Sequence, residues 1–127
     1  MVRKVRRPPI VELEIPDPLQ EWYSDGTGAL WSVARLVDYT KDLPVFDCPL
    51  AALDLGACVW NGSDMMSLAF HWVKVNMADL SKPIIIAWDG GVADGRHRII
   101  KALTLGKRTV KAVRMQERII PDRTAEE

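Results

Sequence analysis

One stretch of the chain predicts a strand, a helix and a second strand in succession: Val92-Ala-Asp-Gly-Arg-His-Arg-Ile-Ile-Lys-Ala-Leu-Thr-Leu-Gly-Lys-Arg-Thr109. The apolar run 83–88 before it predicts a partner strand, and Asp89-Gly90-Gly91 is typical of the reversal that joins paired strands. A helix is expected over about residues 95–105, with Gly106 as its carboxyl-terminal cap. A closing strand is expected to start at Thr109.

The first turn of this expected helix is rich in groups that attract anions. A helix start has unpaired backbone N–H groups and a partial positive charge. Arg96, His97 and Arg98 add two guanidiniums and an imidazole there, and Gly95 allows close approach of a ligand to the backbone. The sequence therefore predicts a phosphate-binding set made of Gly95, Arg96, His97 and Arg98.

Three residues of this region have more than one interpretation. Arg96 falls on the apolar side of a helical wheel, so its guanidinium is expected to reach back over the site or to pair with Asp89 or Asp94. Asp94 is the natural N-cap, and alternatively a ligand for magnesium beside a nucleotide. His97 could also act as a general acid or base near neutral pH, which makes His97 and Asp94 the catalytic candidates.

The amino-terminal part of the chain predicts an extension, residues 1–42, that packs on a domain of residues 43–118. Val11, Leu13 and Ile15 alternate with glutamates and predict a half-exposed strand. A helix is expected over residues 30–40, with Thr27 as its cap. Residues 119–127 are expected to form a flexible tail. Four basic residues open the chain as an arm that either contacts nucleic-acid phosphates or is merely solvated: Arg3, Lys4, Arg6 and Arg7.

A second helix is expected after Asp64, because residues 65–77 are apolar at nearly every position. At 100° per residue, Ser67, His71 and Lys74 share one narrow stripe. This pattern predicts that His71 faces solvent.

Length and composition are typical of one globular domain. The chain has 127 residues, of which 48% are hydrophobic and 27% are charged. It has no apolar run long enough to cross a membrane and no signal peptide at its start. A cytoplasmic protein without membrane contact is therefore expected. The net charge is zero, but residues 12–93 sum to −8 and residues 94–118 to +6. The basic segment either attracts anions locally or faces the acidic part within the fold.

The cysteines and histidines predict no metal centre. Cys48, Cys58, His71 and His97 lack a recognised zinc-ligand spacing. The two cysteines are expected to be reduced and mostly buried.

Three segments resemble the ParB/sulfiredoxin superfamily, most of all its small ParB-like domains: Val45-Phe-Asp-Cys-Pro-Leu-Ala-Ala-Leu53, Asp79-Leu-Ser-Lys-Pro-Ile-Ile-Ile86 and Val92-Ala-Asp-Gly-Arg-His-Arg-Ile99. The resemblance covers about residues 43–115 and implies an α+β fold, a small mixed sheet packed with helices. It also implies a nucleotide at residues 95–98, CTP as in ParB proteins or ATP as in sulfiredoxins, and a nucleoside triphosphate would bring magnesium with it.

The resemblance leaves the activity open. Arg96 stands where sulfiredoxins have their catalytic cysteine and where partition proteins usually have a glutamate, so peroxiredoxin repair is not expected. The first hypothesis is a nucleotide- or phosphate-binding module that works with nucleic acid, of plasmid or phage type. The alternatives are a metal-dependent nuclease or nucleotide hydrolase that uses His97 and Asp94, and a non-catalytic interaction module on the same fold.

Overall fold

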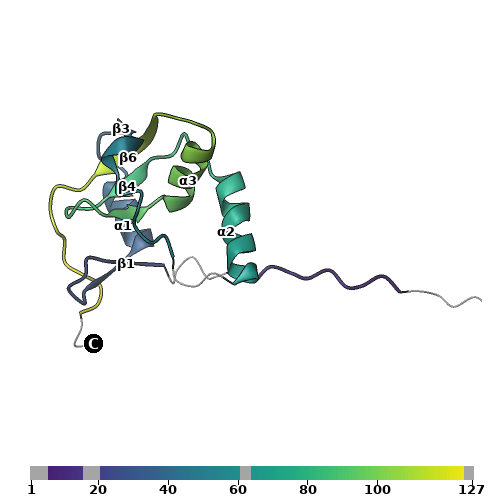
Figure 1. Ribbon diagram of the computed structural model, residues 1–127. Coiled ribbons are helices and arrows are strands. Elements are labelled where there is room, and N and C mark those ends of the chain that lie inside the picture. The colour runs from purple at the N-terminus through teal and green to yellow at the C-terminus, as the bar shows by residue number, and fades with distance from the viewer. Residues whose placement is uncertain (1–5, 16–20, 61–63, 125–127) are drawn as a thin grey trace, which may run out of the picture.

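The computed structural model describes residues 6–15, 21–60 and 64–124, and its centre is a four-stranded mixed sheet (Figure 1). The strand order is β3-β6-β4-β5, in which β6 and β4 are parallel and the two outer pairs are antiparallel. This arrangement confirms the expected α+β class with a small mixed sheet. The strands are β3 (Phe46–Pro49), β4 (Ile84–Ile86), β5 (Val92–Asp94) and β6 (Thr109–Arg114).

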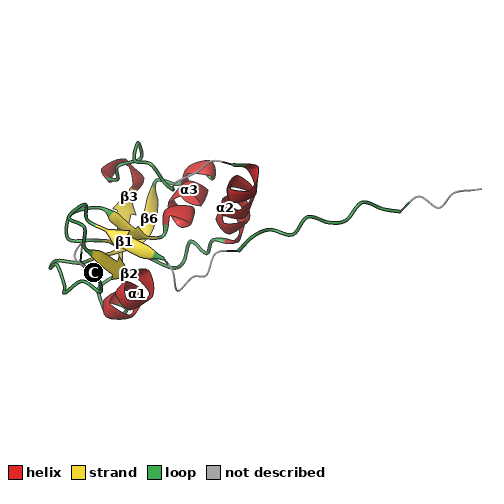
Figure 2. Ribbon diagram, turned by 90° about the horizontal axis from the view of Figure 1, so that it is seen from below, coloured by secondary structure: helices red, strands yellow, loops and turns green. Residues whose placement is uncertain are grey.

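The central strand β4 is buried on both faces, which explains its three consecutive isoleucines. Ile84 and Ile86 pack in one core cluster with Ile99 of the helix α3 (Arg96–Thr104). Ile85 points to the opposite face and packs with Trp31 and Leu36. The sheet therefore has a hydrophobic core on each side, and Figure 2 shows α1 and the α2–α3 pair on opposite sides of the strands.

The second core comes from the segment before residue 43. Strands β1 (Trp22–Ser24) and β2 (Leu30–Ser32) form an antiparallel hairpin, which is followed directly by the helix α1 (Val33–Thr40). Trp31 is fully buried at the centre of this core. The hairpin and α1 are thus part of the same folded body as the sheet.

Two predicted elements in this part of the chain were wrong. Residues 11–15 form no strand, because within the described residues they have no partner strand and their side chains are exposed. The helix begins at Val33 instead of residue 30, because Leu30–Ser32 pair with β1 and the Ser32 side chain, instead of Thr27, caps α1.

The segment after residue 118 is docked on the hairpin, so the expected flexible tail was wrong for its described part. Trp31 Nε1 donates to the backbone oxygen of Ile119 at 3.0 Å. Leu30 exchanges backbone hydrogen bonds with Asp122 and Arg123, and the Asp122 carboxylate pairs with Arg35 at 3.1 Å. Residues 125–127 lie outside the described residues.

The stretch 83–109 folds largely as its sequence predicts. After β4, a turn with Gly90 at φ +86° leads into β5, and α3 follows at once. Gly106 ends α3 at φ +69°, with the bond from Lys107 N to Ala102 O that is typical of glycine-terminated helices. The predicted strand, helix, glycine cap and closing strand are confirmed.

The helix α2 (Met65–Met77) lies against α3 on the side away from the sheet (Figure 1). The Asp64 side chain caps its start by accepting from Ser67 N at 2.7 Å. At its other end, Lys101 of α3 donates to the backbone oxygens of Asn76 and Ala78. A short 3₁₀ turn, η2 (Leu50–Ala52), joins β3 to the loop that leads to α2.

Candidate functional site

The start of α3 is fixed by Gly95, which is pressed against the central strand. Gly95 has φ +104°, and a Cβ at this position would lie 2.5 Å from Ile84 Cγ2. Only glycine fits both the backbone angle and the space. Gly95 is the N-cap and supplies no side-chain acceptor, so the prediction that Asp94 caps this helix was wrong.

Asp94 instead pairs with Arg98. Its carboxylate oxygen lies 3.7 Å from Arg98 Nη1, which also donates to the backbone oxygen of Pro83 at 3.0 Å. Both side chains are largely buried, at 24% and 21% exposure. Arg98 therefore holds the start of α3 to the chain that enters β4, and part of its charge is balanced by Asp94.

Of the two positions expected for Arg96, the structure excludes the ion pair with Asp89 or Asp94. Arg96 reaches back past the helix start, and its Nη1 donates to the backbone oxygen of Val59 at 2.8 Å and makes no ion pair with the described carboxylates. Arg96 is exposed. A guanidinium has five N–H groups, so this single bond leaves most of them available for a ligand.

His97 is held by two residues that the sequence did not associate with it. His71 Nδ1 and His97 Nε2 lie 2.8 Å apart, so one ring donates to the other. The indole of Trp60 stacks on His71 with ring centroids 3.8 Å apart. His71 is half-buried, so the prediction that it faces solvent was wrong.

The reason for this error is the orientation of α2. The polar seam that includes His71 packs against the polar side of α3, where His97 and Lys101 bond to α2. The apolar residues of α2 lie mainly on the other side. A hydrophobic pattern cannot reveal such an arrangement, because it assumes that the apolar face is the buried one.

Both imidazoles are neutral at neutral pH. Burial lowers the pKa of His97 to about 4, with His71, Lys74 and Arg98 acting in the same direction and Asp94 opposing them. Burial also lowers the pKa of His71. The positive charge around the start of α3 therefore comes from Arg96, Arg98 and Lys74, and His97 contributes hydrogen bonding only.

Carboxylates and a phenol surround this region as well. Loss of hydration raises the pKa of the Glu21 carboxyl, Asp94 raises it further, and Lys74 lowers it. Tyr23 donates to the Asp89 carboxylate at 2.5 Å, and burial together with this bond raises the pKa of the phenol. These acidic groups lie beside the helix start, yet no acidic residue stands in the first turn itself.

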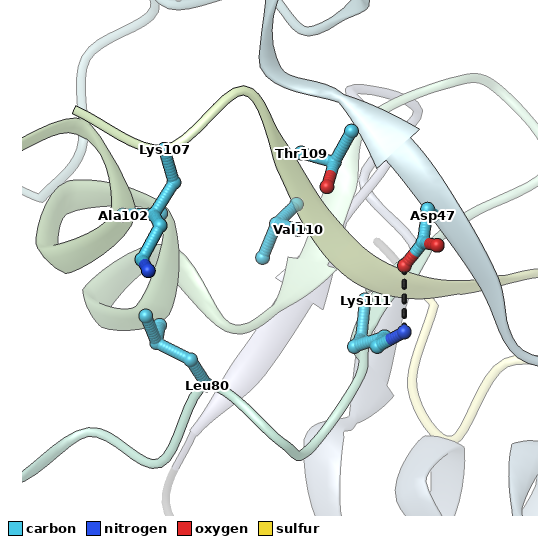
Figure 3. A pocket seen from close by; sticks show the side chains of 7 residues that line it. All are labelled: Asp47, Leu80, Ala102, Lys107, Thr109, Val110 and Lys111. Atoms are coloured by element: carbon cyan, nitrogen blue, oxygen red, sulfur yellow. Dashed lines mark ion pairs between the residues drawn. The ribbon is translucent and has the colours of Figure 1, made fainter. Parts of the chain in front are cut away.

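A cavity of about 120 Å³ lies at the opposite end of α3 (Figure 3). Figure 3 shows Lys107 reaching towards Leu80 on one side, and on the other the ion pair of Lys111 with Asp47, whose Nζ and Oδ1 atoms are 2.7 Å apart. The space is smaller than ordinary ligand pockets, and a helix carboxyl terminus repels anions. The lining residues are Asp47, Leu80, Ala102, Lys107, Thr109, Val110 and Lys111.

The structure describes only some of the remaining predicted residues, which are the basic residues at the start of the chain and the two cysteines. Arg6 and Arg7 are exposed on an extended segment, whereas Arg3 and Lys4 lie outside the described residues. Cys48 is buried and Cys58 is exposed, both as free thiols, so the expectation of burial was wrong for Cys58. Within the described ranges, no three metal-binding side chains gather, and no helix is long and apolar enough to span a bilayer.

Comparisons of the chain with protein-family models, with curated proteins and with solved structures found no match. The likeness of residues 43–115 to ParB-like domains therefore stays an expectation from the sequence.

Proposed function

We propose that this chain is a ParB-like nucleotide- or phosphate-binding module that works with nucleic acid and holds phosphate at the first turn of α3. The observation that carries this proposal is the uncapped helix start. Gly95 offers no side-chain acceptor, and residues 96–98 are all basic types. The first N–H groups of a helix have no acceptor within the helix, and the helix dipole favours negative charge there, which supports an anion site at this turn.

The arrangement of the two arginines supports the same proposal. Arg98 is anchored to the backbone oxygen of Pro83, which gives the guanidinium a fixed position. Arg96 is exposed and is held by Val59 alone among the described residues, so it can close over a bound phosphate. Arginine forks match phosphate oxygens in geometry as well as charge. In the ParB-like interpretation the ligand is CTP or ATP, accompanied by magnesium.

Isothermal titration with ATP, CTP, GTP and pyrophosphate, each with and without Mg²⁺, tests this proposal. At least one ligand is expected to bind, and Arg96→Gln is expected to weaken it at least about tenfold, because a charge-assisted hydrogen bond contributes about 1.5–3 kcal/mol. Lys107→Gln is the matched control, since it removes the same charge at the other end of α3 and should change the affinity less than about twofold. Absence of binding, or an unchanged affinity in Arg96→Gln, contradicts the proposal.

The proposed contact with nucleic acid depends on the basic residues that open the chain. Residues 1–11 carry four basic and no acidic side chains, and the described Arg6 and Arg7 are exposed. Binding to a DNA duplex, followed by fluorescence anisotropy at several salt concentrations, should weaken and become less salt-dependent when residues 1–7 are deleted. A salt dependence that the deletion does not change would show that residues 1–7 do not contact the DNA.

The neutral state of His97 favours one second candidate, metal-dependent hydrolysis of the bound nucleotide or of nucleic acid with His97 and Asp94. A neutral imidazole can accept a proton, although its Nε2 already contacts His71. Product release measured with Mg²⁺ should be abolished in His97→Gln. Turnover that persists in this variant rules out His97 as the base.

A further inference from the structure

The helix α2 exposes its apolar face. Its outward side chains include Met65, Trp72 and Val73, which are 90%, 59% and 41% exposed. Val75 is its one buried residue among those described. The polar side of α2 packs against α3 instead, where His71 is hydrogen-bonded to His97.

The exposed residues form one continuous stripe. Met65, Ala69, Trp72 and Val73 follow the spacing i, i+4, i+7 and i+8, which places them on one side of a helix. Leu68, which is 53% exposed, borders the stripe. Monomeric proteins rarely leave a large contiguous apolar surface open to water, so this stripe indicates an interface.

A second apolar surface without a partner lies on the extended segment 6–15, which we name the arm. It shares only Arg6 and Arg7 with the basic residues that open the chain. Val11, Leu13 and Ile15 are 75%, 37% and 75% exposed. Within the described residues the arm forms no hydrogen bond with the folded body. Figures 1 and 2 both show it leaving the folded body near α2 and running away from the molecule. In an extended chain, alternate residues share one side, so these three side chains form a single apolar edge.

We infer that the arm of one copy docks on the α2 stripe of a second copy, and that the second copy returns the same contact. The two surfaces match in length, because Val11 to Ile15 spans about 13 Å when extended at ~3.3 Å per residue. Met65 to Val73 spans about 12 Å along a helix axis at ~1.5 Å per residue.

A second copy is the occupant that the geometry favours, because the arm leads away from its own α2. A two-fold exchange covers both arms and both stripes. It also forms the contact twice, which doubles the buried area.

Sedimentation velocity of the full chain over a range of concentrations tests this dimer. The wild-type chain is expected to form a dimer. Leu13→Asp in the arm and Trp72→Glu in the stripe are each expected to raise the dissociation constant at least about tenfold, and Glu12→Gln, on the opposite edge of the arm, is expected to leave it unchanged. Met65→Lys serves as a second stripe variant, since Met65 is almost fully exposed and contributes little to folding.

Mixing the two kinds of variant distinguishes an arm exchange from direct packing of two α2 helices. The Leu13→Asp chain keeps an intact stripe and the Trp72→Glu chain keeps an intact arm, so an equimolar mixture should associate more strongly than either variant alone. A wild-type chain that stays monomeric overturns the inference. A dimer that Leu13→Asp does not weaken overturns it too, because such a dimer does not use the arm.

Discussion

The two ends of α3 differ, although each carries a glycine in the left-handed region. Gly95 is packed so closely against Ile84 that a methyl group would not fit, whereas a methyl group on Gly106 would meet nothing within 4 Å. Gly106 only terminates a helix. Gly95 brings the helix start against the central strand, and this contact positions the basic side chains that follow it.

The charged side chains differ in the same way. Arg96 and Arg98 at the first turn donate to backbone oxygens that are distant in the sequence. Lys107 at the other end makes no hydrogen bond or ion pair through its side chain within the described residues. The first-turn arginines are therefore anchored to distant parts of the chain, whereas Lys107 beside the cavity is not anchored to any described residue.

The largest expected effect compares the two glycines. Gly95→Ala should lower the free energy of unfolding by about 3 kcal/mol, because the new Cβ combines a left-handed backbone angle with overpacking against Ile84. Gly106→Ala should cost only about 1 kcal/mol, from its backbone angle. Urea denaturation measures both, and the loss of unfolded-state entropy cancels between them. Equal costs would show that α3 is not pressed against the sheet at Gly95.

The next effect concerns the arginine anchor. Arg98→Ala should destabilise the fold by about 2 kcal/mol, because it leaves the Pro83 oxygen without its donor and Asp94 without its partner. Lys107→Ala should change the stability by less than about 0.5 kcal/mol. Thermal and urea unfolding of the two variants provide the measurement. If Arg98→Ala is as stable as Lys107→Ala, Arg98 does not hold the helix start.

The smallest effect is a pH dependence at the first turn. The pKa of His97 lies at about 4 in the folded chain and at 6.5 without the fold, so the unfolded state binds more protons between these values. The free energy of unfolding should therefore fall as the pH drops from 6.5 to 4, by about 1 kcal/mol after allowance for solvent screening. His97→Gln should flatten this part of the curve, while carboxylate titration is common to both proteins. Parallel curves would show that His97 does not stay neutral in the folded state.

The elements that local chemistry determines were predicted correctly from the sequence. The turn at Asp89–Gly91, the helix after it and the glycine stop at Gly106 all depend on neighbouring residues. The buried isoleucines of β4 were recognisable for the same reason. The basic first turn of α3 was also predicted, because its residues are consecutive.

The residues whose contacts come from a distant segment were predicted wrongly from the sequence. Leu30–Ser32 extend a helical pattern but pair with β1 and with the chain at Arg123. His71 was placed on a solvent-facing stripe, but it bonds to His97, 26 positions along the chain. The partner of Arg96 is a backbone oxygen at Val59, and a carbonyl carries no signal in a sequence.

The central claim is that the first turn of α3 binds phosphate, and the most direct test is a ¹⁵N NMR titration of the full chain with pyrophosphate, MgATP and MgCTP. If phosphate binds there, the amide signals of residues 96–98 shift most, those of residues 107–111 stay in place, and Arg96→Gln reduces the shifts. Shifts that centre on Lys107–Lys111, or a spectrum that none of the three ligands changes, would contradict this claim.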